Sequence, residues 1–279
     1  MTTDRDRNEK DTLDDSMLDN IIRFAIAHRW LMLAMTLVLL AYLWRDRWEP
    51  EPPRLLVLAF LWGATVAIIV SVALEAYIEA TINPGQDEAS FATVAVVAPV
   101  VEEAAKGLFL LIMMTGRRRN ELNSLTDCLV YAGVVAVGFA WLEDILYIAD
   151  GENLASSLVT AAMRLIMGPF AHPLFTTFIG IGVYFALQQR NTLAKVGYVL
   201  LGYAAAVIMH GLWNGSALVG VEAYFGVYVL WMMPIFGLAI TLASQGRYVG
   251  VAPLGTALTD EQARQLATLS TRPIVATDA

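Results

Sequence analysis

The sequence has few charged residues and almost no cysteine. Its one cysteine, Cys128, excludes an internal disulfide framework and any metal site built from several cysteines. Charged residues make up only 16% of the 279 residues, whereas soluble domains contain about a quarter, so a water-soluble enzyme is not expected. The net charge of −8 also argues against a nucleic acid as partner.

Apolar residues are abundant instead. They make up 57% of the chain, and the mean hydropathy of +0.58 exceeds what a single globular core can bury, so we predict an integral membrane protein. Most apolar stretches approach or exceed the about 20 residues that a membrane-spanning helix needs. We therefore predict an all-α, polytopic transmembrane helix bundle with about seven membrane segments, within a range of six to eight. The segments are 30–44, 55–74, 91–115, 128–149, 155–187, 196–219 and 224–244.

Two of these segments have unusual lengths. Segment 30–44 is marginal, and whether it spans the membrane stays open. Segment 155–187 is too long for one straight span and contains Gly168, Pro169 and Pro173. We predict an approach helix at 155–167 and a span at about 168–187, with two full spans as the alternative.

The charges of the loops predict the orientation. Lys and Arg occur in loops 45–54, 116–127 and 188–195, whereas loops 75–90, 150–154 and 220–223 have none. Basic loops face the cytoplasm, so the C-terminus is predicted to be cytoplasmic. The N-terminal tail is mixed in charge but also contains Lys and Arg, so either segment 30–44 does not span or its tail is translocated. The predicted parts are a polar tail at 1–29, a transmembrane domain at 30–246 and a polar tail at 247–279.

Six charged residues lie inside the apolar segments. Each costs roughly 2.5–3.5 kcal/mol at the centre of a membrane, so we expect these side chains to pair or to perform chemistry. They are Glu102, Glu103, Lys106, Glu143, Asp144 and Arg164.

Three of the six stand in one segment. Lys106 follows Glu102 by four residues and Glu103 by three, and both spacings make neighbours on a helix. Adjacent residues point about 100° apart, so we expect one glutamate to pair with Lys106 and the other to face an aqueous cavity. The alternative is a buried Glu–Lys pair that only fixes helix contacts.

The next two segments add a carboxylate and a histidine. Glu143 lies on the helix face of Phe139, whereas Asp144 is turned away and could serve the outer interface. His172 stands between two prolines, in a stretch that we expect to be irregular. Irregular backbone at membrane depth is tolerated where it lines a cavity or packs against protein.

The sixth segment holds His210 and Asn214, four residues apart on one helix face. Gly211 between them lets another helix approach closely. Hydrogen bonding between helices is the alternative role for this pair. Counting residues from the loops places His210 and Glu143 in the outer half of the membrane, and Glu102 and Glu103 near its middle. These compatible depths favour one shared site within 91–219.

Histidine, asparagine and carboxylate side chains together favour the activation of water. A carboxylate in such a cavity can deprotonate a water molecule, and Asn and His can donate hydrogen bonds to an oxyanion. The set therefore fits hydrolysis of a peptide bond within the membrane, and Glu and His could equally bind a metal ion. No His-Glu-x-x-His and no Gly-x-Ser-x-Gly motif is present.

The motifs on these segments resemble the PrsW family of intramembrane proteases, which is related to the CPBP superfamily of CAAX-processing proteases. The resemblance covers about 91 to 219, and the residue after Glu143 departs from it, because Asp144 stands where asparagine is expected. The matching motifs are Glu102-Glu103-Ala-Ala-Lys106, Phe139-Ala-Trp-Leu-Glu143, His172 in Ala-His-Pro, and His210-Gly-Leu-Trp-Asn214.

The resemblance implies a bacterial protease of the cytoplasmic membrane that cleaves a single-span membrane protein, such as an anti-sigma factor. It implies Glu102 as the base, oriented by Glu103 and Lys106, although the choice between the two glutamates stays open. Glu143 and His172 would complete the water site, and His210 and Asn214 would donate to the oxyanion. A divalent metal such as zinc is also left open.

Two other functions are compatible with buried charges. One is a proton-coupled transporter or channel, whose carboxylates would relay protons. The absence of an internal repeat weakens a transporter built from inverted repeats. The other is a non-catalytic membrane scaffold that keeps the polar groups for helix pairing.

Overall fold

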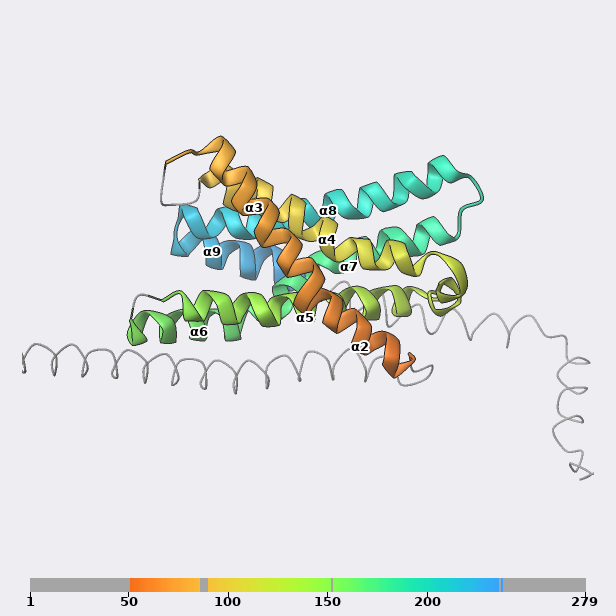
Figure 1. Cartoon of the computed structure of the whole chain (residues 1–279), viewed down its shortest axis with the longest axis horizontal. Helices are drawn as coiled ribbons and strands as arrows, with labels where there is room; N and C mark the ends of the chain where they lie inside the picture. Colours follow the sequence, from red (N-terminus) through yellow and green to blue (C-terminus); the bar gives the residue numbers. More distant parts are fainter. Residues whose placement is uncertain (1–50, 86–89, 152, 236, 238–279) are drawn as a thin grey trace, which may run out of the picture. The chain divides into compact units, whose positions relative to one another are not determined.

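The computed structural model describes residues 51–85, 90–151, 153–235 and 237, and every regular element in these ranges is helical (Figure 1). Within these described ranges, three helical stretches are long and apolar enough to cross a membrane, namely Pro53–Ile82, Leu125–Ala149 and Thr192–Val219. Two shorter apolar helices are Ala171–Leu187 and Val221–Ile235. The predicted all-α class is therefore confirmed. Segment 30–44 and both predicted tails lie outside the described residues.

The first long helix crosses the central one closely. It consists of α2 (Pro53–Leu61), the π-helical turn η1 (Trp62–Ala67) and α3 (Ile68–Ile82). Its crossing partner is α5 (Leu125–Ala149), which begins with a capping box formed by Ser124 and Asp127. A Cβ atom on Gly138 of α5 would lie 2.1 Å from the carbonyl oxygen of Phe60, so only glycine allows this approach.

Helix α4 (Ala98–Met113) follows a π-helical turn, η2 (Thr93–Val97). Pro99 in its first turn has no N–H group to bond the carbonyl of Ala95, which explains why the regular ladder is interrupted here. Such π-turns are frequent at functional sites. The short 3-10 helix η3 (Gly116–Glu121) connects α4 to α5.

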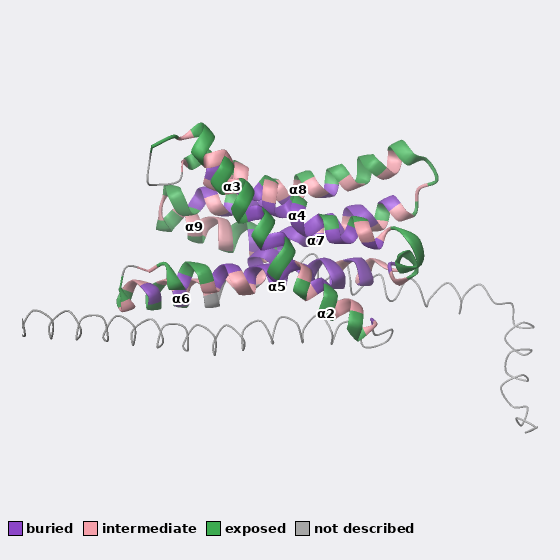
Figure 2. Cartoon of the chain, viewed as in Figure 1, coloured by how far each residue is buried: buried purple, intermediate pink, exposed green. Residues whose placement is uncertain are grey.

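The long apolar segment 155–187 is broken where the sequence predicted. Helix α6 (Leu154–Met167) ends at the 3-10 turn η4 (Gly168–Phe170), and α7 (Ala171–Leu187) begins directly after it. Both α6 and α7 pack against α5. Figure 2 shows that α5 and α7 hold much of the buried core.

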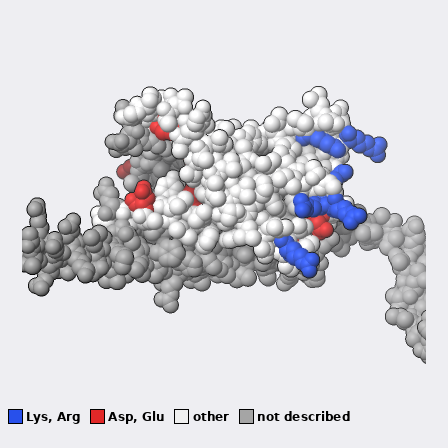
Figure 3. All heavy atoms as spheres, in the orientation of Figure 1, with Lys and Arg blue, Asp and Glu red and all other residues white. Residues whose placement is uncertain are grey.

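Helix α8 (Thr192–Val219) packs mainly on α7 and also on α4, and is followed by α9 (Val221–Val227) and the π-helical turn η5 (Tyr228–Met232). Lys and Arg side chains gather at one end of this helix bundle (Figure 3). They come from the start of α2, from η3, from the α7–α8 connection and from the first turn of α8, in agreement with the predicted alternation of loop charge. These residues are Arg54, Arg117, Arg118, Arg119, Arg190 and Lys195.

Candidate active site

Helix α4 supplies a buried cluster of two carboxylates and one ammonium group. The Lys106 side chain is fully buried, and its Nζ donates to Glu102 Oε2 and to Glu103 Oε1, at 2.9 Å each. The expectation that only one glutamate pairs with Lys106 is therefore wrong. The spacings of three and four residues bring the long Lys106 side chain over the turn that carries both glutamates, so its ammonium group lies between the two carboxylates.

His172 connects this cluster to α5. Its Nδ1 lies 2.9 Å from Lys106 Nζ, and its Nε2 lies 2.9 Å from Glu143 Oε2. The residue lies in the first turn of α7 and not in irregular backbone as expected. Pro173 is compatible with this turn because the first N–H groups of a helix have no partner within the helix.

His210 approaches the same two glutamates from α8. Its Nδ1 lies 3.1 Å from Glu103 Oε1, and its Nε2 lies 3.9 Å from Glu102 Oε2. Its ring stacks on Phe175 at 4.7 Å between centroids. Gly211 makes this position possible, because a Cβ atom there would lie 2.6 Å from the Ala95 carbonyl oxygen. The predicted close helix approach at Gly211 is thus confirmed.

Two further predicted residues adjoin the cluster. The Phe139 ring lies beneath the Lys106 ammonium group, with Nζ 3.8 Å from the ring centroid, which is a cation–π contact. Asn214 lies one helical turn beyond His210, and its Nδ2 donates to the Val94 carbonyl oxygen at 3.1 Å. The structure thus joins the predicted carboxylates, Lys106, Phe139 and both histidines in one cluster, whereas Asn214 binds the backbone beside it.

Asp144 and Arg164 form the part of the site that the sequence left unexplained. Arg164 of α6 donates from Nε to Asp144 Oδ1 at 2.6 Å and from Nη2 to Glu143 Oε2 at 2.5 Å. Its guanidinium group also covers the Tyr147 ring at 3.9 Å. Asp144 is buried and paired with Arg164, a partner that the sequence did not predict. The reason is that α6 lies along α5, and its arginine binds both adjacent carboxylates.

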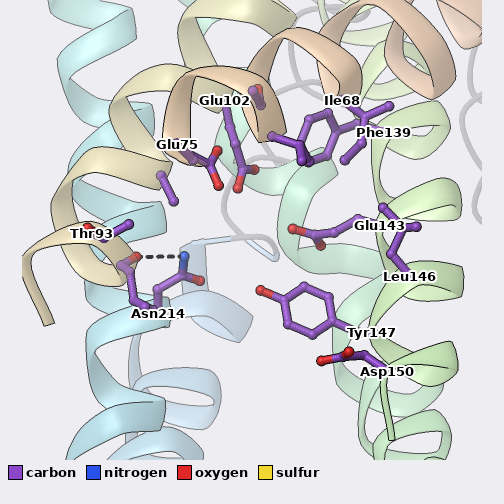
Figure 4. Close-up of a pocket in the computed structure, with 14 residues that line it drawn as sticks. Ile68, Glu75, Thr93, Glu102, Phe139, Glu143, Leu146, Tyr147, Asp150 and Asn214 are labelled. Carbon is purple, nitrogen blue, oxygen red and sulfur yellow. Dashed lines mark hydrogen bonds between the residues drawn. The ribbon is translucent and has the colours of Figure 1, made fainter. Parts of the chain in front are cut away.

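A cavity of about 410 Å³ opens beside the cluster (Figure 4). Glu102, Glu143 and Asn214 line it, together with Ser71 and Glu75 of α3, which the sequence analysis missed. Glu75 follows the apolar segment 55–74 directly and was therefore assigned to a loop, but α3 continues to Ile82. The signal was the helical spacing of four residues from Ser71 to Glu75.

Four residues of the cluster could hold a metal ion. Ligand atoms of Glu102, Glu103, His172 and His210 all lie within 4.8 Å of one another, and all four residues are buried. Carboxylate oxygen and imidazole nitrogen are donors that zinc accepts, so the set fits this metal. A bound cation would compete with the Lys106 ammonium group for three of these residues.

Comparison with known proteins gives one consistent family. A family model described as PrsW family intramembrane metalloprotease matches residues 51–239, which is more than half of the chain. Protease PrsW of Clostridioides difficile (strain 630) is 25% identical over 187 residues, or 66% of this chain and 76% of that protein. Protease PrsW of Geobacillus kaustophilus (strain HTA426) is 25% identical over 211 residues, or 75% and 87% of the two chains. No solved structure gives a significant match.

Proposed function

Because the chain belongs to the PrsW family of intramembrane proteases, we propose that it hydrolyses a peptide bond in a membrane-anchored protein, with Glu102 as the general base. The observation that carries this choice is the position of the two adjacent glutamates. Glu102 lines the cavity, whereas Glu103 is fully buried. Glu103 is also bound by Lys106, Thr176 and His210, so it is not available to a water molecule in the cavity.

In this proposal Glu102 takes a proton from water in the cavity, and the water oxygen attacks the carbonyl carbon of the substrate. Lys106 holds the Glu102 carboxylate in place through the hydrogen bond at 2.9 Å. Glu143 lies on the cavity wall and orients His172. Asn214 lies on the opposite wall and is the proposed donor to the oxyanion.

The family description implies a metal, and Glu103, His172 and His210 are the residues that would hold zinc and leave Glu102 to move the proton. A zinc ion would supply a Lewis acid that makes a bound water more acidic. Two histidines and one glutamate are a ligand set that catalytic zinc sites use. Chelation should abolish cleavage and added zinc should restore it, and metal analysis of the purified protein should find zinc that is lost in His172→Ala.

The membrane arrangement is part of the same proposal. The chain is a multi-pass membrane protein, and we infer about seven spans with the basic loops and the C-terminus in the cytoplasm of a bacterial cell. Glu143 and Asp150 of α5 then lie toward the outer side, where the cavity lining includes Asp150. The proposed substrate is a single-span protein cut near the outer half of the membrane, and an anti-sigma factor is one such protein. The bilayer is the other partner, and no nucleic acid is expected.

The experiment compares membrane proteomes of cells that contain the unaltered chain, Glu102→Gln or Glu222→Gln. Glu222 is an exposed carboxylate on α9, so its variant controls for the charge change. Fragments of single-span proteins should appear with the unaltered chain and the control, and should fall by about 10²–10⁴-fold with Glu102→Gln. Equal fragments in all three strains would refute the assignment. A fourth strain with Glu103→Gln is added, and loss of fragments there but not with Glu102→Gln would move the base to Glu103.

A further inference from the structure

The α3 wall of the cavity carries two polar side chains on one face. Ser71 and Glu75 are four residues apart, so they lie one above the other along the helix. Both line the cavity, as does Glu143 of α5. In Figure 4 the Glu75 carboxylate lies beside that of Glu102 and points into the cavity.

Both residues have a buried polar atom without a partner. Among the described residues, Ser71 Oγ and Glu75 Oε1 make no hydrogen bond, and Ser71 is only 1% exposed. The next carboxylate on the same helix is different, because Glu79 accepts hydrogen bonds from Asn83 and Ser90. Buried polar atoms are normally hydrogen-bonded, so these two unsatisfied oxygen atoms indicate a ligand that supplies hydrogen-bond donors.

The charge of the cavity wall indicates the kind of donor. The lining contains four carboxylates and, within the described chain, neither Lys nor Arg. Glu102 and Glu143 have their own cations, Lys106 and Arg164. No ion pair within the described chain joins Glu75 to a cation, because Lys106 and Arg164 pair with other carboxylates. The α3 wall therefore has excess negative charge in a low-dielectric setting, where a cation is attracted strongly.

We propose that Ser71 and Glu75 form a subsite that binds a lysine or arginine side chain of the substrate, close to the bond that is cut. The inference rests on the proposed function and names the chemistry of the substrate that the same cavity selects. The cationic group donates hydrogen bonds to the Glu75 carboxylate and to Ser71 Oγ, so both unsatisfied oxygen atoms gain a hydrogen-bond partner. The substrate segment then carries its positive charge toward the outer half of the membrane.

The test uses synthetic single-span reporter proteins that are identical except for one residue. The varied residue is lysine, glutamine or glutamate. Separate reporters carry it at each of the ten positions around the outer membrane boundary of the span. Cleavage is measured in liposomes with the full-length unaltered chain, Ser71→Ala, Glu75→Gln, Glu75→Lys and the control Glu222→Gln. The Glu75 side chain is half-buried and forms no ion pair within the described chain, so its replacement by glutamine is not expected to unfold the protein. Slow labelling of buried Cys128 verifies this.

We expect the unaltered chain and the control to prefer lysine over glutamine at one position by about tenfold to a hundredfold. Glu75→Gln should lose this preference, Ser71→Ala should weaken it, and Glu75→Lys should prefer glutamate. A lysine preference that is unchanged in Glu75→Gln would overturn the inference, and so would the absence of any lysine preference in the unaltered chain.

A binding measurement separates this inference from the proposed function. Val72, which also lines the cavity, is replaced by cysteine in a Cys128→Ala background, and reporters with one cysteine are trapped by a disulfide. Trapping that depends on lysine and is lost in Glu75→Gln, without any cleavage, would support the subsite and reject the protease activity. Cleavage without lysine dependence rejects the subsite alone, and neither cleavage nor lysine-dependent trapping rejects both.

Discussion

The Lys106 ammonium group stabilises the buried cluster, so its removal is the most informative single change. Lys106 Nζ binds Glu102, Glu103 and His172 at 2.9 Å each, and the side chain is fully buried. Lys106→Met retains most of the volume and removes the charge. Breaking a buried ion pair by removing one partner costs about 3–5 kcal/mol, because the other charge is left uncompensated. We expect a decrease of this size in the free energy of unfolding.

The chain carries its own probe of unfolding. Cys128 is the one cysteine and is fully buried, so a maleimide reacts with it after the helices separate. A loss of 3–5 kcal/mol corresponds to an increase in the open population of about a hundredfold to a few thousandfold. Labelling of Lys106→Met in detergent should accelerate by this factor. The matched control is Lys195→Met in the first turn of α8, where a change outside the core is expected to alter stability by less than about 0.5 kcal/mol.

A second variant shows whether charge is the cause. Glu103→Gln removes one of the two carboxylates that Lys106 binds, so Lys106→Met should destabilise a Glu103→Gln background less than it destabilises the unaltered chain. Zinc bound by the same residues would replace the missing cation, so added zinc should slow the labelling of Lys106→Met. If Lys106→Met labels as slowly as Lys195→Met, the cluster is not held by this charge and the reasoning fails.

Two further changes test other parts of the structure. Arg164→Gln should lower cleavage by about tenfold to a hundredfold, because it releases Glu143. Arg164→Lys should keep only part of the activity, because lysine cannot bind both carboxylates with a planar fork. Arg190→Gln is the exposed control, and equal cleavage rates of the three variants would count against this role of Arg164. Gly138→Ala should reduce the free energy of unfolding by about 1–3 kcal/mol, measured as faster labelling of Cys128. Gly226 has open space around it, so Gly226→Ala should leave the labelling rate unchanged. Equal labelling rates of the two variants would contradict the close crossing of α2 and α5.

Much of the site followed from the sequence because charged residues are costly in apolar segments. Spacings of three and four residues identified the pairing partners of Lys106, and the proline-containing interruption in 155–187 predicted the break between α6 and α7. These are local features of a helix, which a sequence shows directly. The prediction that His210 and Asn214 lie on one helix face rests on the same kind of local feature.

The contacts between helices could not be predicted in the same way. Arg164 and Asp144 are twenty residues apart, and nothing in their spacing states that α6 returns along α5. Glu75 was missed for another reason, because hydropathy placed the end of the helix at the first charged residue, whereas backbone hydrogen bonding continues α3 to Ile82. The spacing of four residues from Ser71 to Glu75 was the local sign that the helix continues past the first charged residue.

The break between α6 and α7 explains how one carboxylate oxygen receives two donors. On an unbroken helix, residues 164 and 172 would be separated by about 12 Å along the axis. Arg164 Nη2 and His172 Nε2 nevertheless meet at Glu143 Oε2, from opposite sides of the turn Gly168–Phe170. Because His172 also binds Lys106, a shift of α6 would be transmitted through Glu143 to the α4 cluster. The broken helix therefore couples α6 to the proposed base, and Arg164→Gln tests this coupling without touching α4.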